Sequence, residues 1–410
     1  MISRALIAAL PKSDVHTHLD GAMRISTLID LAREQGVQLP SYEVSGLQEQ
    51  VFKPIYRDLS DYLLGFEYMC AVLRQPEALA RAAYEMAEDV IAQGVRYLEV
   101  RFAPQRIADS GEACVQAFKA VHDGLTRAAR TFNQSEQVRS QGDLPFEWSI
   151  ICCAMRHFGR GMGPYFDRLL DMLPGMTDKE LSSVASLEAI RSAVVARDKH
   201  GVPVMGFDLA GEEAGYRAGH HDAAYVEAHR HFIRKTVHAG EAYGPESICD
   251  AIVHCHAERI GHGTFLFDAA RIKNPAIIDR QAYTESLAEY IATMRITLEV
   301  CPTSNLQTIP ELEGKMCNHP VKRMLDYGMS VAVATDNLLV SNTNINQELA
   351  LVADACELDL IAFKRLVLGG FKAAFYPGRY IEKKRFVQRA AERIDWIIAQ
   401  GVDRKQVGGV

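Results

Sequence analysis

Two histidines stand one residue apart in SDVHTHLDG, residues 13–21, within a short apolar segment. Side chains two apart on a β-strand point to the same side, so His16 and His18 could converge on one ion. Neutral imidazole is a common ligand of zinc and other divalent first-row metals. A second such pair, HCH at 254–256, lies in a helical pattern, where residues two apart diverge by about 200° around the axis. The strand context favours the first pair as a metal site.

Three further segments place histidine and carboxylate side chains directly after apolar runs. These side chains are His238 and Glu241 in HAGE, His262 in GHG, and Asp336 in VATDN. Each has a structural explanation when taken alone, such as a histidine in a tight turn or a carboxylate that caps a helix. The glycines on both sides of His262 would let the backbone come close to it. Because four apolar runs end in such groups, the pattern indicates an enzyme.

The elements that must position these groups are eight short apolar runs, most of them followed by a helical pattern. The runs are residues 13–19, 95–104, 146–155, 202–211, 234–241, 259–264, 295–304 and 329–337. Near-continuous apolar strands that alternate with helices imply a parallel sheet covered on both faces. Eight such units match a (β/α)8 barrel better than an open sheet, which is the alternative.

The predicted fold class is therefore α/β, a (β/α)8 TIM-type barrel that spans residues 1–410 as a single domain. Additional helices are expected after the first strand, at about 40–75, and at the C-terminus, at about 345–401. In such barrels chemistry takes place at the C-terminal ends of the strands. The polar groups named above stand at those ends.

Composition limits the partners and the compartment. The formal net charge is −7, and acidic and basic residues are interspersed without a basic stripe. We therefore expect neither nucleic acid nor a membrane as the main partner. Nine cysteines without a CxxC pair indicate reduced thiols in a cytoplasmic protein. The sequence leaves the oligomeric state open.

Eight motifs along the chain resemble those of a known family. They are PKSDVHTHLDGA, YLEVRFAP, CCAMRH, GFDLAGEE, TVHAGEAYGPESI, RIGHGT, LEVCPTSNLQT and HPVKRMLDYG followed by VATDN. In this order, from about Pro11 to beyond Glu348, they resemble the adenosine deaminase family of the amidohydrolase superfamily. The resemblance implies one Zn²⁺ ion per chain, bound by His16, His18, His238 and Asp336.

The resemblance also implies roles for the residues around the metal. Glu241 would donate a proton to the purine ring nitrogen N1, and His262 would orient the metal's water and help to deprotonate it. The substrate would be contacted by the Gly211 N–H at the ring, by Asp20 at the ribose 5′-hydroxyl, and by an apolar lid of Leu59, Tyr62, Leu63 and Phe66. The implied reaction is hydrolytic deamination of a small-molecule purine nucleoside, adenosine or 2′-deoxyadenosine, to the inosine product and ammonia.

Two features depart from the family pattern. Asn337 stands where the family has a second aspartate that binds the purine N7; its amide can donate to N7 directly. A polar segment at 268–293 is longer than usual, as a surface insertion or an interface. Other 6-aminopurines are therefore alternative substrates: adenine, a 5′-modified adenosine or aminofutalosine. Asp20 favours a free 5′-hydroxyl, because it would repel a phosphate.

Two alternative functions belong to other functional classes. A purine-binding protein without catalysis would keep the fold, but none of the implied metal or catalytic positions is altered here. A metal hydrolase of esters or cyclic amides would often use a bridging lysine on the fourth strand. The fourth run, VPVMGFDLAG, contains no lysine, which favours a single-metal site.

Overall fold

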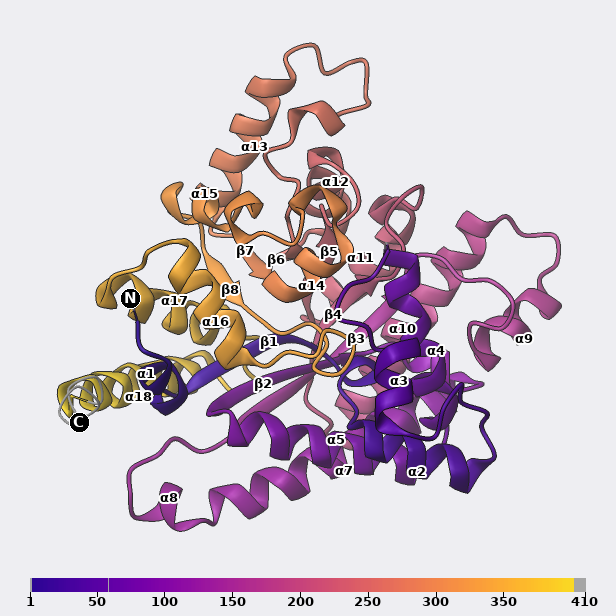
Figure 1. Cartoon of the computed structure of the whole chain (residues 1–410). Helices are drawn as coiled ribbons and strands as arrows, with labels where there is room; N and C mark the ends of the chain where they lie inside the picture. Colours follow the sequence, from indigo (N-terminus) through magenta and orange to yellow (C-terminus); the bar gives the residue numbers. More distant parts are fainter. Residues whose placement is uncertain (1, 58, 402–410) are drawn as a thin grey trace.

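The computed structural model describes residues 2–57 and 59–401, without the side chains of Leu59 and Ser60. Eight parallel strands form one sheet in sequence order (Figure 1). They are β1 Lys12–His18, β2 Val95–Phe102, β3 Glu147–Met155, β4 Val204–Ala210, β5 Arg234–Ala239, β6 Arg259–His262, β7 Thr297–Val300 and β8 Val331–Val333. Thr17 in β1 pairs with Asp336 just after β8, which closes the sheet on itself. The predicted (β/α)8 barrel is confirmed.

Helices connect and cover the strands. They are α1 Arg4–Ala9, α2 Ile25–Gln35, α3 Val44–Gln50, α4 Leu59–Val72, α5 Pro76–Ala92, α6 Pro104–Ile107, α7 Gly111–Asn133, α8 Glu136–Arg139, α9 Pro164–Met172, α10 Asp178–His200, α11 Asp222–Arg230, α12 Pro245–Cys255, α13 Arg280–Met294, α14 Pro302–Thr308, α15 Val321–Asp326, α16 Ile345–Ala355, α17 Leu360–Ala373 and α18 Tyr380–Ala399. Proline opens α5 and α12, where its missing N–H costs nothing. Gly201 ends α10 in the left-handed conformation. None of the described helices is long and apolar enough to cross a membrane.

The strands are buried along almost their whole length, as expected for a parallel sheet covered by helices. The barrel interior nevertheless contains charges. Arg101 in β2 pairs with Asp208 in β4 at 2.8 Å and with Glu299 in β7 at 2.9 Å, and all three side chains are fully buried. Buried ions are tolerated when each one is paired, because an unpaired one would cost several kcal/mol.

Two groups of helices lie outside the repeating units. Helices α3 and α4 fall within the expected segment 40–75, and α16, α17 and α18 fall within 345–401. The segment 268–293 forms a loop and most of α13, which stands out at the top of Figure 1. Ile278 in that loop is 95% exposed, whereas Ala288 and Ile291 in α13 are fully buried, so the loop lies on the surface and α13 packs against the barrel's helices.

Candidate active site

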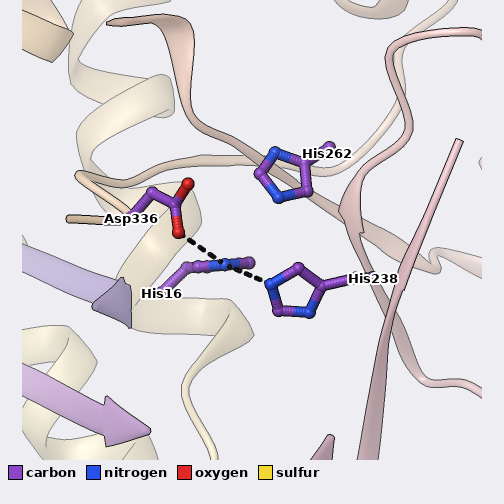
Figure 2. A group of neighbouring side chains, drawn as sticks. All are labelled: His16, His238, His262 and Asp336. Carbon is purple, nitrogen blue, oxygen red and sulfur yellow. Dashed lines mark hydrogen bonds and ion pairs between the residues drawn. The ribbon is translucent and has the colours of Figure 1, made fainter. Parts of the chain in front are cut away.

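Side chains from β1, β5, β6 and the end of β8 converge at the C-terminal end of the barrel. Ligand atoms of His16, His238, His262 and Asp336 lie within 4.8 Å of one another (Figure 2). His18 reaches the same place, because its Nε2 lies 3.3 Å from His238 Nε2 and 3.5 Å from Asp336 Oδ1. His16 Nε2 lies 3.1 Å from His238 Nε2 and 3.4 Å from Asp336 Oδ1.

These four distances fit a tetrahedral metal site. In a tetrahedral zinc site with bonds of about 2.0–2.1 Å, the ligand atoms are about 3.3–3.4 Å apart. The measured separations are 3.1–3.5 Å. His262 also belongs to the group within 4.8 Å, but its Nε2 is directed to the Glu241 carboxyl, at 3.7 Å. The separations therefore favour His18 over His262 as the fourth ligand.

Buried carboxylates hold two of the imidazoles in the tautomer that a metal requires. His16 Nδ1 donates to Glu299 at 2.6 Å, and His238 Nδ1 donates to Asp208 at 3.1 Å. Burial by itself would raise the pKa values of Asp208 and Glu299. The nearby charge of Arg101 helps to outweigh this effect of burial, so the pKa of each carboxyl group lies well below its usual range. Each imidazole therefore carries its proton on Nδ1 and a lone pair on Nε2.

The donor set fits a cation. Two Nε2 lone pairs face each other at 3.1 Å with the Asp336 carboxylate beside them, and without a positive charge between them they would repel. A histidine and carboxylate set of this kind is typical of zinc. The residues present thus satisfy the requirements of the metal that the sequence predicts.

The backbone turns sharply where two of these side chains enter the site. Asp336 and His262 both have positive φ, 61° and 67°. This conformation is uncommon for residues other than glycine, and such strain is concentrated at functional sites. Gly261 is needed for close packing, because a Cβ there would lie 3.0 Å from the His16 ring.

Glu241 is the buried acid of the site. It is 7% exposed, and burial, together with the charges of Asp336 and Glu213, raises its pKa to about 8. In the metal-free site its carboxyl group is therefore mostly protonated at neutral pH, as a general acid needs. The Asn305 amide donates to His262 Nδ1 at 3.0 Å, so neutral His262 carries its proton on Nε2, facing Glu241.

A cavity joins these groups to the expected substrate residues. Its lining includes the predicted residues His18, Asp20, Tyr62, Leu63, Phe66, Gly211, His238, Glu241, His262, Asp336 and Asn337. The Leu59 side chain lies outside the described residues. The cavity measures about 60 Å³, whereas small-molecule pockets usually measure about 300–1,000 Å³. The side chains that line the cavity must therefore move before a purine can bind there.

Helix α4 closes the cavity through a tyrosine. The Tyr62 hydroxyl accepts a hydrogen bond from the Asn337 amide at 2.6 Å and shares one with Ser341 Oγ at 2.7 Å. One of the two N–H groups of the amide that was expected to bind the purine N7 is thus bound to the predicted lid residue. The bond links the predicted N7 contact to helix α4.

The family model described as Adenosine deaminase matches residues 11–392. The chain belongs to the adenosine deaminase family. An adenosine deaminase from Mycolicibacterium vanbaalenii is 32% identical over 371 residues, which are 90% of this chain and 91% of that protein. A probable adenosine deaminase from Dictyostelium discoideum is 31% identical over 379 residues, which are 91% of this chain and 42% of that longer protein.

Solved structures of related proteins share the fold of this adenosine deaminase family member. An N6-methyl-AMP deaminase from Arabidopsis thaliana superposes with a TM-score of 0.70 at 21% identity, covering 95% of this chain and 98% of that one. A zinc-bound amidohydrolase from Burkholderia ambifaria gives 0.73 at 20% identity, covering 98% and 95%. The family model and the curated relatives therefore support a hydrolytic deaminase of a 6-aminopurine, and the solved structures show that the fold is shared.

Sequence reasoning missed several residues of this site. Arg106, in α6, lines the cavity near Asp20 and is 7% exposed; its guanidinium makes no hydrogen bond or ion pair within residues 2–57 and 59–401. Burial raises the pKa of Asp20 to about 6 against the opposing charge of Arg106. Arg101 and Glu299 were also missed. Their signal was a charge inside an apolar run, which must be paired.

Proposed function

We propose that the chain deaminates adenosine and 2′-deoxyadenosine with one zinc ion per chain. The observation that carries this proposal is the buried Glu241 carboxyl group, whose pKa is raised by burial, in the same cavity as His18, His238 and Asp336. His16 lies directly behind that lining, with its Nε2 3.1 Å from His238 Nε2. An acid of raised pKa beside a metal matches the two demands of the reaction. The ring nitrogen must be protonated, and water must be made nucleophilic at neutral pH.

Different residues of the site would bind the metal, donate the proton and orient the water. His16, His18, His238 and Asp336 would hold the zinc, which, when bound, lowers the pKa of water toward about 7. Glu241 gives its proton to N1, which makes the neighbouring carbon C6 electrophilic. His262 was expected to orient the attacking water and to help to deprotonate it. With its proton on Nε2, beside Glu241, it can orient the water as a hydrogen-bond donor, while the Glu241 carboxylate formed in the first step accepts the water's proton. The water oxygen bonds to C6, and the proton that water gives up restores the Glu241 acid. The remaining hydroxyl proton moves to the amino group, the C6–N bond breaks, and ammonia leaves as the C6=O of inosine forms.

The substrate would be held around these groups. Gly211 would offer its N–H to the ring, Asn337 its amide to N7, and Asp20 its carboxyl group to the ribose 5′-hydroxyl. Helix α4 would act as the lid, with Tyr62, Leu63 and Phe66 over the purine and Leu59 at its start. The withdrawal of Tyr62 from Asn337 would then accompany substrate entry.

A second candidate substrate is a 5′-phosphorylated 6-aminopurine nucleoside. Arg106 supports it, because a buried guanidinium without a partner in the described structure is suited to a phosphate. Asp20 opposes it, because its carboxylate would repel the same phosphate. The two charges together favour a neutral hydroxyl, which can donate to Asp20 and accept from Arg106.

The test is the ultraviolet change of zinc-loaded protein with adenosine, 2′-deoxyadenosine, adenine and AMP, with ammonia release measured in parallel. Fast turnover of both nucleosides and slow turnover of adenine and AMP would support the proposal. Preference for AMP would establish the second candidate, and the variant R106Q should then reduce AMP turnover selectively. Binding of all four without turnover would identify a purine-binding protein and refute the proposal.

A further inference from the structure

The buried carboxylate of Glu213 accepts five hydrogen bonds, which is an unusually large number. Glu213 follows Gly211 by two residues and is 4% exposed. Its two oxygens accept hydrogen bonds from four consecutive backbone N–H groups and from the Ser247 hydroxyl in α12. The backbone donors are Gly240 at 2.7 Å, Glu241 at 2.9 Å, Ala242 at 2.6 Å and Tyr243 at 2.9 Å.

These donors belong to the turn that carries the acid. Strand β5 ends at Ala239 and α12 begins at Pro245, so residues 240–243 have neither a strand nor a helix to satisfy their N–H groups. Gly240 adopts φ 70°, which starts the turn. Buried backbone N–H groups need partners, and hydrogen bonds to a charged acceptor contribute about 1.5–3 kcal/mol each. Glu213 supplies the acceptors for the whole turn.

We infer that Glu213 is a positioning residue for deamination, because it holds the backbone of residues 240–243 so that the Glu241 carboxyl group stays in the cavity. This inference rests on the role of Glu241 in the proposed function. The carboxylate binds the N–H of Glu241 itself, so a change at Glu213 is transmitted directly to the acid. The acid stands 3.7 Å from His262, and a displacement of about 1 Å in such an arrangement can reduce the rate about 100-fold.

The adjacent residue provides a matched control. Glu212 has the same charge and is one residue away, but it is exposed. In the variant E213Q, an amide N–H2 replaces one of the acceptor oxygens and would face backbone N–H groups as a second donor. The variant E213D keeps the charge but is one methylene shorter. The variant S247A removes one of the five bonds and leaves the turn's own N–H partners in place.

The experiment compares kcat, KM, inhibition by inosine and bound zinc in the full-length, zinc-loaded variants. We expect E213Q to lower kcat for adenosine at least 30-fold, with KM, the inosine inhibition constant and the zinc content within about threefold of wild type. E213D should recover part of the loss, S247A should lose less than E213Q, and E212Q should match wild type. Amide hydrogen exchange should rise at residues 240–243 in E213Q alone.

Two results would overturn the inference. One is a kcat of E213Q within threefold of wild type. The other is a loss of activity that only follows the loss of bound zinc, since Glu213 would then be a structural residue without a role in positioning Glu241. Failure of the proposed function is a separate result, because wild-type protein would then turn over neither nucleoside. Hydrogen exchange would still report in that case whether Glu213 holds the turn, and unchanged exchange in E213Q would refute it.

Discussion

Replacing Glu241 by glutamine should abolish most turnover and at the same time change how stability depends on pH. An amide has no proton to give to N1, so we expect kcat to fall by at least 100-fold, within the range usual for loss of a general acid. Metal binding should persist, because Glu241 is not among the four ligand positions. Bound zinc is the control that separates loss of the acid from loss of the site.

The stability effect follows from the burial of the acid. The pKa of Glu241 is raised from the ordinary 4.5 to about 8, chiefly by burial. Its contribution to stability is complete below pH 4.5 and is lost as the pH rises to 8, because the unfolded chain releases the proton first. Between pH 6 and pH 8 the free energy of unfolding should fall by about 2.3 kcal/mol, because the slope of 1.36 kcal/mol per pH unit decreases to half as the pH reaches the pKa of about 8.

The assay is urea unfolding of the metal-free wild type and of Glu241→Gln at pH 6, 7, 8 and 9. Metal-free protein is required because a nearby cation would stabilise the carboxylate and lower its pKa. Between pH 6 and pH 9 the difference in free energy of unfolding between the two proteins should shift by about 2.7 kcal/mol in favour of the glutamine variant, with the change levelling off above pH 8. Glu212→Gln, at an exposed position, should show no such shift. Parallel pH curves for wild type and Glu241→Gln would refute the reasoning.

Three further changes test other parts of the site. Asp208→Asn removes the anionic acceptor of the His238 Nδ1–H and should weaken metal binding about 10- to 100-fold in a chelator competition; equal affinity would contradict the role of Asp208. Tyr62→Phe removes the hydroxyl that holds Asn337, so opening should cost about 1 kcal/mol less and KM for adenosine should fall about fivefold; a higher KM would mean that the hydroxyl binds substrate. Asp336→Ala should lose zinc and activity together, and zinc retained at the wild-type level would show that Asp336 is not a ligand.

The barrel was predictable because local patterns determine it. The apolar runs are strands that end near their polar residues, and proline and glycine mark the helix ends as expected. The convergence of His16 and His18 on one place was predictable for the same reason, since alternation along a strand places both on one side. The HCH pair at 254–256 lies at the end of α12, and the His254 side chain is 46% exposed. The strand context, which the sequence shows, therefore separated the two pairs correctly.

The sequence by itself thus determined the architecture and the types of group at the strand ends, because both depend on residues close together along the chain. The tertiary structure decided which groups act on one another. Glu213 reaches the turn that carries Glu241 about 28 residues later, and Tyr62 meets Asn337 from 275 residues away. Arg106 was likewise placed in the cavity by packing between elements. Such contacts depend on how the barrel closes, and closure is set by burial and strand register summed over the whole chain, which no local pattern records.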